Sequence, residues 1–250
     1  MDHVIWGVGL SQVLGIVFPS DAMSWQEIFL RWIHFLAGIT WIGMLYFFNL
    51  VNVNFMKALD APTKGKVVPE LLPRALFWFR WGAVVTVLAG LWYYMIILTL
   101  EPNAGGNIGR WFGMVILAWI LIFLILRPVS GALNNGYLIA LLVAILMILL
   151  SWGVLRFNSS EGSSNEALSI GIGGGMGVIM LLNVWGIIWP HQKRIIAWTK
   201  ANATQGTPMP PEAAKLARRA FLASRMNTWL SLPMLFFMAA AHHFPFLGKV

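Results

Sequence analysis

The chain has 250 residues, of which 59% are hydrophobic and only 10% are charged, and its formal net charge is +8. A soluble domain carries about 25% charged residues, so this composition excludes an ordinary water-soluble globule and predicts an integral membrane protein. The absence of cysteine excludes disulfides, thiolate metal sites, iron–sulfur clusters and covalently attached c-type haem. We expect no nucleic-acid partner, because the bases fall mainly in two loops between apolar segments.

The first apolar segment, Val4–Phe18, is only about 15 residues long, which is short for a membrane span. We interpret it as an interfacial segment, with a re-entrant segment and a short span as the alternatives. Residues 1–23 are therefore expected to form an apolar N-terminal segment outside the helical bundle.

The rest of the chain alternates between long apolar stretches and polar connections. A membrane-spanning helix needs about 20 mostly apolar residues. Five stretches fit the required length well, namely Glu27–Leu50, Phe77–Leu100, Ile108–Leu126, Gly136–Leu155 and Leu168–Trp189. A sixth stretch, Asn227–Phe244, is slightly short but strongly apolar. The predicted fold is an all-α integral membrane protein, a single domain over residues 1–250 with a bundle of about six transmembrane helices.

The basic residues predict the orientation of this bundle. In a six-helix arrangement, 13 of the 17 bases fall on one side, and basic loops mark the cytoplasm. Both termini are therefore expected to be extracytoplasmic. The 13 bases lie mostly in the loops Val51–Leu76 and His191–Met226, and they are Lys57, Lys64, Lys66, Arg74, Arg80, Arg127, Lys193, Arg194, Lys200, Lys215, Arg218, Arg219 and Arg225.

Two segments have a local signature of their own. In the basic cytoplasmic loop 191–226, Pro210 and Pro211 precede Glu212–Ala223, which we expect to form a helix that lies along the membrane surface and runs into the last span. The segment Gly171–Gly177 holds five glycines within a predicted span. Small residues of this kind favour close helix packing rather than nucleotide binding.

His34 is the first candidate for chemistry, because a histidine inside a membrane helix is costly and is a functional candidate by default. It lies seven residues after Glu27, about 10 Å inside the outer boundary. Gly38 and Trp41 follow on the same helix face, and a glycine one turn from a histidine leaves a flat gap for a porphyrin. We interpret His34 as an axial ligand of haem iron, the alternative being a buried histidine hydrogen-bonded to another helix.

His242 and His243 end the last span on the same side of the membrane as His34. Two helices thus bring histidines to a similar depth, which is the arrangement that a bis-histidine b-type haem requires. Ala239, four residues before His243, offers the same kind of clearance on the last helix. Arg31, one turn outward of His34, is expected to pair with a haem propionate or, equally well, to anchor the helix at the interface.

Two blocks of sequence are similar to a known family. The first is RWIHFLAGITWIGMLYFFN at Arg31–Asn49, and the second joins NVWGIIWPHQKRI at Asn183–Ile195 to ASRMNTWLSLPMLFFMAAAHHFP at Ala223–Pro245. Together they resemble the membrane domain of the PuuD-type urate hydroxylase family, also called the urate oxidase N-terminal domain. They are also similar to shorter bacterial relatives that lack its C-terminal tail.

This resemblance implies a location in the bacterial inner membrane and a cytochrome c domain after the last span in full-length members. The family's His–aromatic–Pro ending matches His243 to Pro245, which favours His243 over His242, and its Trp–x–His element matches Trp32 and His34. Without cysteine this chain is not expected to carry that domain, so we expect a separate extracytoplasmic cytochrome c or other redox subunit to be the partner.

The favoured interpretation is a membrane-embedded b-type haem protein that passes electrons to that cytochrome, within a lipid bilayer and as part of a multisubunit membrane complex. The alternative is a non-catalytic membrane subunit of a larger respiratory, photosynthetic or oxygenase complex, with Gly171–Gly177 as a docking surface. A small-solute transporter ranks last, because no acidic residue lies in the middle of a span. No catalytic residue or substrate can be assigned from the sequence, so enzyme activity stays open.

Overall fold

The computed structural model describes residues 15, 18–101, 104–127 and 134–248, with the main chain alone for 104–107. The segment Val4–Phe18 lies almost wholly outside the described residues, so its interfacial position stays a prediction. Throughout the described part of the chain the regular elements are helices. The predicted all-α fold is therefore confirmed.

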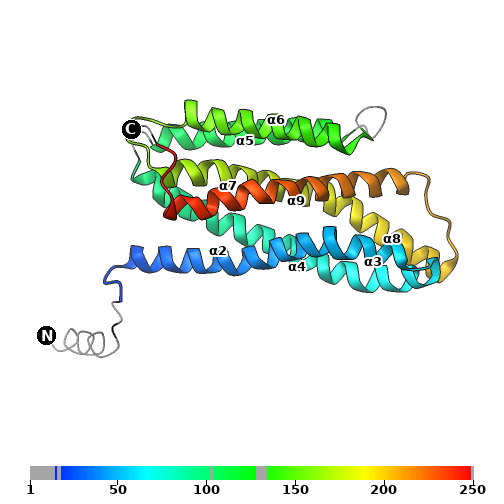
Figure 1. Ribbon diagram of the computed structural model, residues 1–250. Helices are drawn as coiled ribbons and strands as arrows, with labels where there is room; N and C mark the ends of the chain where they lie inside the picture. Colours follow the sequence, from blue (N-terminus) through cyan, green and yellow to red (C-terminus); the bar gives the residue numbers. More distant parts are fainter. Residues whose placement is uncertain (1–14, 16–17, 102–103, 128–133, 249–250) are drawn as a thin grey trace.

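The described residues form six long helical rods (Figure 1). Two rods are continuous through a short π-helical turn, η1 in the first and η3 in the fifth. The rods are α2 Ala22–Tyr46 with η1 Phe47–Asn52 and α3 Val53–Ala58; α4 Ala61–Thr99; α5 Ala104–Leu126; α6 Gly136–Phe157; α7 Asn165–Asn183 with η3 Val184–Ile188 and α8 Trp189–Gln205; and α9 Ala213–His243.

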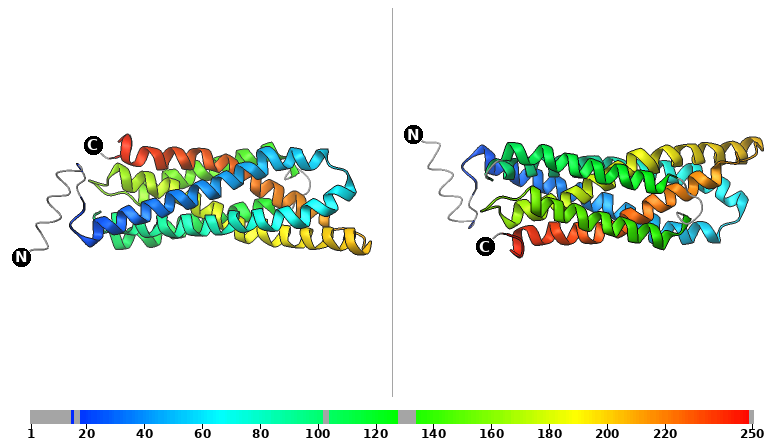
Figure 2. Two further views of the ribbon diagram at one scale, coloured as in Figure 1. Left: turned by 90° about the horizontal axis from the view of Figure 1, so that it is seen from below. Right: turned by 90° about the horizontal axis from the view of Figure 1, so that it is seen from above.

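The rods lie roughly along one common axis, as three views of the bundle show (Figures 1 and 2). Helix α7 is central and contacts α4, α5, α6 and α9, whereas α2 packs mainly on α4. The first residue of α2 and the last residue of α9 lie at the same end, as an even number of spans requires. We call this the terminal end of the bundle, and the opposite end, where most of the bases lie, the basic end.

Five of the six rods are long and apolar enough to cross a membrane. The sixth, α9, is 31 residues long and packs along α7, and its first half carries four bases while its second half is apolar. The bundle therefore has the composition of a multi-pass membrane protein. The orientation derived from the basic loops stays a prediction.

The helices are longer than the apolar stretches that predicted them. The first, second and fifth rods have 37, 39 and 41 residues, although about 20 suffice to cross a bilayer. The segments Val51–Leu76 and His191–Met226, expected to be loops, are therefore mostly helical. Helix α3, the first half of α4, α8 and the start of α9 extend the bundle beyond α5 and α6 at the basic end (Figures 1 and 2).

The helix after Pro211 forms and runs into the last span, as expected. It begins at Ala213 and continues without interruption to His243. Leu216, Ala220 and Ala223 are buried in the bundle, so this part of α9 is held by the neighbouring helices. The physical reason is that an apolar stripe on a helix can be buried by protein beyond the membrane as well as by lipid.

Side-chain caps explain where several rods begin. The Asp21 and Asp60 carboxylates accept hydrogen bonds from the main-chain N–H groups of Ser24 and Thr63, both at 2.8 Å, and such caps satisfy otherwise unpaired donors. At Asp60, outside the membrane, the hydrogen bonds from Thr63 lower the pKa of the carboxyl group. Gly206 ends α8 with a φ of 67°, a left-handed conformation that glycine adopts without strain.

The glycines between 171 and 177 face the interior of the bundle. A Cβ at Gly173 would lie 2.6 Å from Met238 Cε and 3.0 Å from Phe237 Cβ, both on α9, and one at Gly175 would lie 3.2 Å from a methyl group of Val115 on α5. Glycine therefore allows α7 to approach its neighbours closely, as the composition predicted. Because the segment is covered by α5 and α9, it is not a docking surface for another subunit.

Candidate functional site

His34 lies on the face of α2 that packs against α4. Its ring Nδ1 is 2.8 Å from the main-chain oxygen of Thr86. Because a carbonyl oxygen only accepts hydrogen bonds, Nδ1 carries the proton and donates it. The ring also rests on Gly90, where a Cβ would lie 2.8 Å from the ring Cε1. The imidazole is thus fixed in position and tautomer, and its Nε2 has no hydrogen-bond partner among the described residues.

Gly38 and Trp41 serve the α2–α4 contact in this structure. A Cβ at Gly38 would meet the Thr86 methyl group at 3.7 Å, which is ordinary contact. Trp41 is 1% exposed, and its main-chain nitrogen would lie 3.2 Å from a Cβ at Gly82. The Thr86 methyl group of α4 is thus the nearest atom to this face of Gly38, and the flat gap expected beside His34 stays a prediction.

A second polar group gathers at the terminal end, with one residue from each of four helices. His242 Nε2 of α9 lies 2.7 Å from a carboxylate oxygen of Glu166 at the start of α7. The Tyr93 hydroxyl of α4 donates to the same oxygen at 3.0 Å and lies 3.2 Å from His242 Nε2. The Arg31 guanidinium of α2 lies 5.8 Å from the centre of the Tyr93 ring. We call these four residues the terminal cluster.

His243 behaves differently from its neighbour. It is the last residue of α9, it is exposed, and it makes no hydrogen bond or ion pair with the described residues. His34 contacts Gly90 and His242 contacts Tyr93, both on α4. Three residues of helix separate Gly90 from Tyr93, a rise of about 4.5 Å along the α4 axis. The histidines of α2 and α9 thus lie toward the same end of the bundle, as their positions in the sequence suggested.

The sequence analysis missed Tyr93 and Glu166. Tyr93 lies within an apolar span and Glu166 lies in the first turn of α7, where acidic residues are common for helix stability alone. A signal existed, because a carboxylate next to a span on the same side as a histidine pair is a plausible ion-pair partner. Which of the nearby acids makes that contact depends on helix packing.

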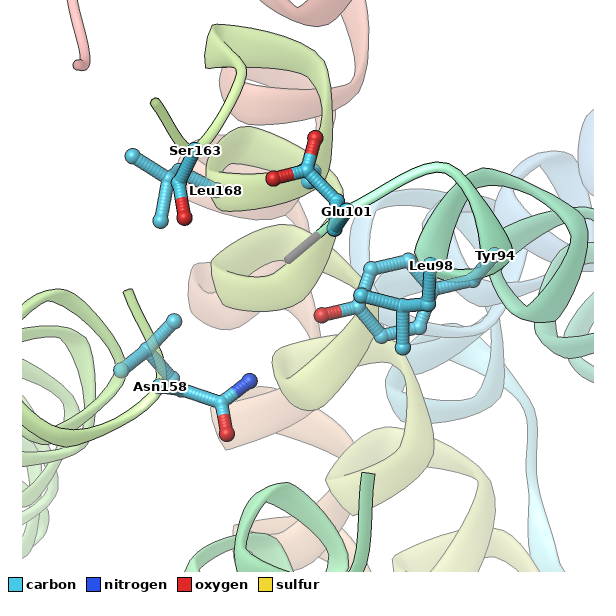
Figure 3. Close-up of a pocket in the computed structure, with 8 residues that line it drawn as sticks. Tyr94, Leu98, Glu101, Asn158, Ser163 and Leu168 are labelled. Carbon is cyan, nitrogen blue, oxygen red and sulfur yellow. The ribbon is translucent and has the colours of Figure 1, made fainter. Parts of the chain in front are cut away.

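A small cavity between α4, α6 and α7 lies at the same end (Figure 3). Its volume is about 10 Å³, so it has room for about one water molecule and none for a haem. In Figure 3 the Tyr94 hydroxyl and the Asn158 amide point toward one another across it. Asn158 Oδ1 is buried without a hydrogen-bond partner in the described part of the chain, whereas Glu101 accepts from the Ser164 N–H at 3.2 Å.

Buried asparagines accompany both π-helical turns. Asn49 in η1 donates through Nδ2 to Ser224 Oγ at 2.8 Å. Asn183, directly before η3, donates to Asn227 Oδ1 at 2.8 Å, and Asn227 donates to the Met180 oxygen at 3.0 Å. Helix α9 is therefore hydrogen-bonded to the first and fifth rods at the level where each changes its helical pitch.

Comparison with protein-family models gives a match over most of the chain. A family model described as "Urate oxidase N-terminal" matches residues 58–249. The matched region covers α4 to α9, including Tyr93, Glu166, His242 and His243, and it begins after His34. No curated protein matches the chain, and no solved structure does.

Proposed function

Because the chain belongs to the urate oxidase N-terminal family, we propose that it is a membrane electron-transfer protein that holds one b-type haem between His34 and His243. The observation that carries this proposal is the hydrogen bond from His34 Nδ1 to the Thr86 oxygen. A histidine that ligates a metal commonly donates its other ring N–H to a backbone carbonyl, which fixes the ring. Nε2 is then the ligating atom.

The residues at the terminal end fit such a group in part. His34 is oriented and has a partnerless Nε2, and His243 is unengaged at the end of α9. His242 is held by Glu166 and Tyr93, so it fixes the end of α9 rather than competing as a ligand. A Cβ at Gly38 would lie 3.7 Å from the Thr86 methyl group, so the clearance expected at Gly38 stays part of the proposal.

In this proposal, a bound b-type haem would accept and release one electron at a time. His34 would keep its ring plane fixed through Thr86 and Gly90. Arg31 lies in the terminal cluster, at the same end of the bundle as His34, and would pair with a propionate. Electrons would leave at the terminal end, toward a separate extracytoplasmic cytochrome c or other redox subunit.

Visible spectroscopy tests the proposal on the purified chain of residues 1–250, as isolated and after incubation with haem. We expect a Soret band and reducible α and β bands from the wild type. His34→Ala and His243→Ala should lose the bands, whereas His191→Ala, which changes a histidine at the basic end, should keep them. His242→Ala should keep the bands while loosening the end of α9.

Size-exclusion chromatography and circular dichroism show whether each variant is folded. If the wild type never binds haem, or if folded His34→Ala keeps a normal spectrum, the haem proposal is wrong. The chain is then better explained as a non-catalytic subunit of a larger membrane complex. Gentle detergent extraction followed by mass spectrometry should recover a cytochrome or other redox subunit in either case, and isolation as a lone, fully active monomer would contradict the predicted partnership.

A further inference from the structure

Arg80 of α4 is an arginine without an acidic partner. It is half-buried, and its guanidinium carbon lies 3.5 Å from the centre of the Trp189 ring and 5.3 Å from that of Trp185. Its Nε donates to the Leu76 oxygen at 3.1 Å. No carboxylate among the described residues lies within ion-pair distance. Within the described part of the chain, the two terminal nitrogens of Arg80 have no hydrogen-bond partner and its charge has no counter-charge.

Two other arginines near the basic end have acidic partners. Arg74 pairs with Glu70 at 2.7 Å, and Arg194 pairs with Glu212. The side chain of Arg74 is 72% exposed, so water solvates it readily. Arg80 has no acidic partner among the described residues and is only partly exposed to solvent. A partly buried charge without a counter-charge is costly.

Arg80 lies about one hydrocarbon thickness away from the terminal end of α4. From Arg80 to Thr99, at the terminal end of α4, the helix rises about 29 Å, and from Asn165 to Trp185 the fifth rod rises about 30 Å. Both lengths equal the thickness of the hydrocarbon core of a bilayer, about 30 Å. Trp81 packs edge-on against Trp185 at 5.6 Å, and tryptophan is enriched at this boundary.

We propose that Arg80, stacked on Trp189 and Trp185, binds the phosphate group of an anionic phospholipid from the leaflet at the basic end. A guanidinium that stacks through its face keeps its edge free, and that edge matches two phosphate oxygens. The phosphate supplies the missing counter-charge at the height where lipid phosphates lie. The tryptophan rings cover the glycerol and upper acyl region beside it. This site is independent of the haem proposal.

The experiment compares thermal unfolding of the full chain in detergent supplemented with phosphatidylglycerol, phosphatidylcholine or inorganic phosphate. We expect phosphatidylglycerol to raise the Tm of the wild type above the value in phosphatidylcholine, with little effect from inorganic phosphate. Arg80→Gln should lose this difference. Arg74→Gln, the matched control six residues away on the same helix, should keep it.

Native mass spectrometry gives a second readout that does not depend on stability. Phosphatidylglycerol should stay bound to the wild type and to Arg74→Gln, and be lost from Arg80→Gln. Trp189→Leu, which keeps the charge but removes the stacking, should retain less lipid than the wild type. If Arg80→Gln lowers the Tm equally in both lipids and still retains phosphatidylglycerol, Arg80 only joins α4 to α8 and the proposal is wrong. An equal stabilisation by inorganic phosphate would also overturn the assignment to a lipid.

Discussion

The imidazole of His34 rests on the main chain of Gly90, where a Cβ would lie 2.8 Å from the ring Cε1 and 2.9 Å from Nδ1. Real Cβ atoms essentially never approach other atoms so closely, so no residue larger than glycine fits at position 90 unless the ring moves. Gly90 and the Thr86 oxygen together determine where His34 Nε2 points. Gly90 is therefore a positioning residue for the proposed ligand.

Gly90→Ala should displace the His34 ring. We expect it to lower the free energy of unfolding by about 1–3 kcal/mol, the usual cost of overpacking, and to weaken haem retention. Gly43→Ala on α2 is the control, because a Cβ there meets nothing within 4 Å. If thermal unfolding and the Soret band of Gly90→Ala match those of Gly43→Ala, the ring is not held as described.

The packing of α7 on α9 can be tested with two glycines one helical turn apart. Gly173→Ala should destabilise the bundle by about 1–3 kcal/mol, because the new methyl group would overlap Met238 and Phe237. Gly177→Ala should be neutral or stabilising by up to about 1 kcal/mol, since the space there is open and alanine favours helix. Unfolding in mixed detergent micelles measures both, and equal effects would argue against this α7–α9 contact.

The buried pair Asn183 and Asn227 should be energetically coupled. Each single change to alanine leaves the other asparagine short of a hydrogen bond, so a double-mutant cycle should give a coupling of about 0.6–2 kcal/mol, as for polar pairs between membrane helices. The cycle of Asn183→Ala with Ser231→Ala is the control, because Ser231 bonds Tyr46 instead. Coupling no larger than in this control would mean that the pair does not form.

The orientation of the bundle can be tested directly because the chain has no cysteine. Single cysteines at Lys66, at the basic end, and at Glu161, in the turn between α6 and α7, are treated with an impermeant thiol reagent on intact cells. The excess of bases at one end predicts labelling at position 161 only. Labelling at position 66 but not at 161 would reverse the orientation.

The sequence predicted the membrane spans well because lipid selects for apolar stretches of a fixed length. It did not predict where the helices end. Phe77 was expected to begin the second span, yet α4 begins at Ala61 and contains Pro69 and Pro73. Hydropathy reports the boundary of the lipid, whereas a helix continues wherever neighbours cover it. At Gly65, for example, α4 comes so close to Ala203 of α8 that a Cβ would lie 2.8 Å from that residue's Cβ.

The site was predicted less completely, for a geometric reason. His34 was identified from its depth and from its neighbours in the sequence, and both are properties of its own helix. The roles of Gly38 and Gly90 depend on which helix faces α2 and at what height, which one sequence does not contain. His242 and His243 are consecutive residues, so their side chains point in directions about 100° apart around the α9 axis. Which of them faces a given neighbour depends on the rotation of α9 in the bundle. The structure assigns the contacts with Glu166 and Tyr93 to His242.

The two π-helical turns, η1 and η3, carry an evolutionary consequence. A π turn accommodates an extra residue within an α-helix, so it arises by inserting one amino acid and disappears by deleting one. Without it, everything beyond would rotate by about 100° around the helix axis, and Lys57 on α3 or Trp189 on α8 would face different neighbours. In an alignment of relatives, single-residue gaps should therefore concentrate at 47–52 and 184–188, inside spans where gaps are otherwise avoided.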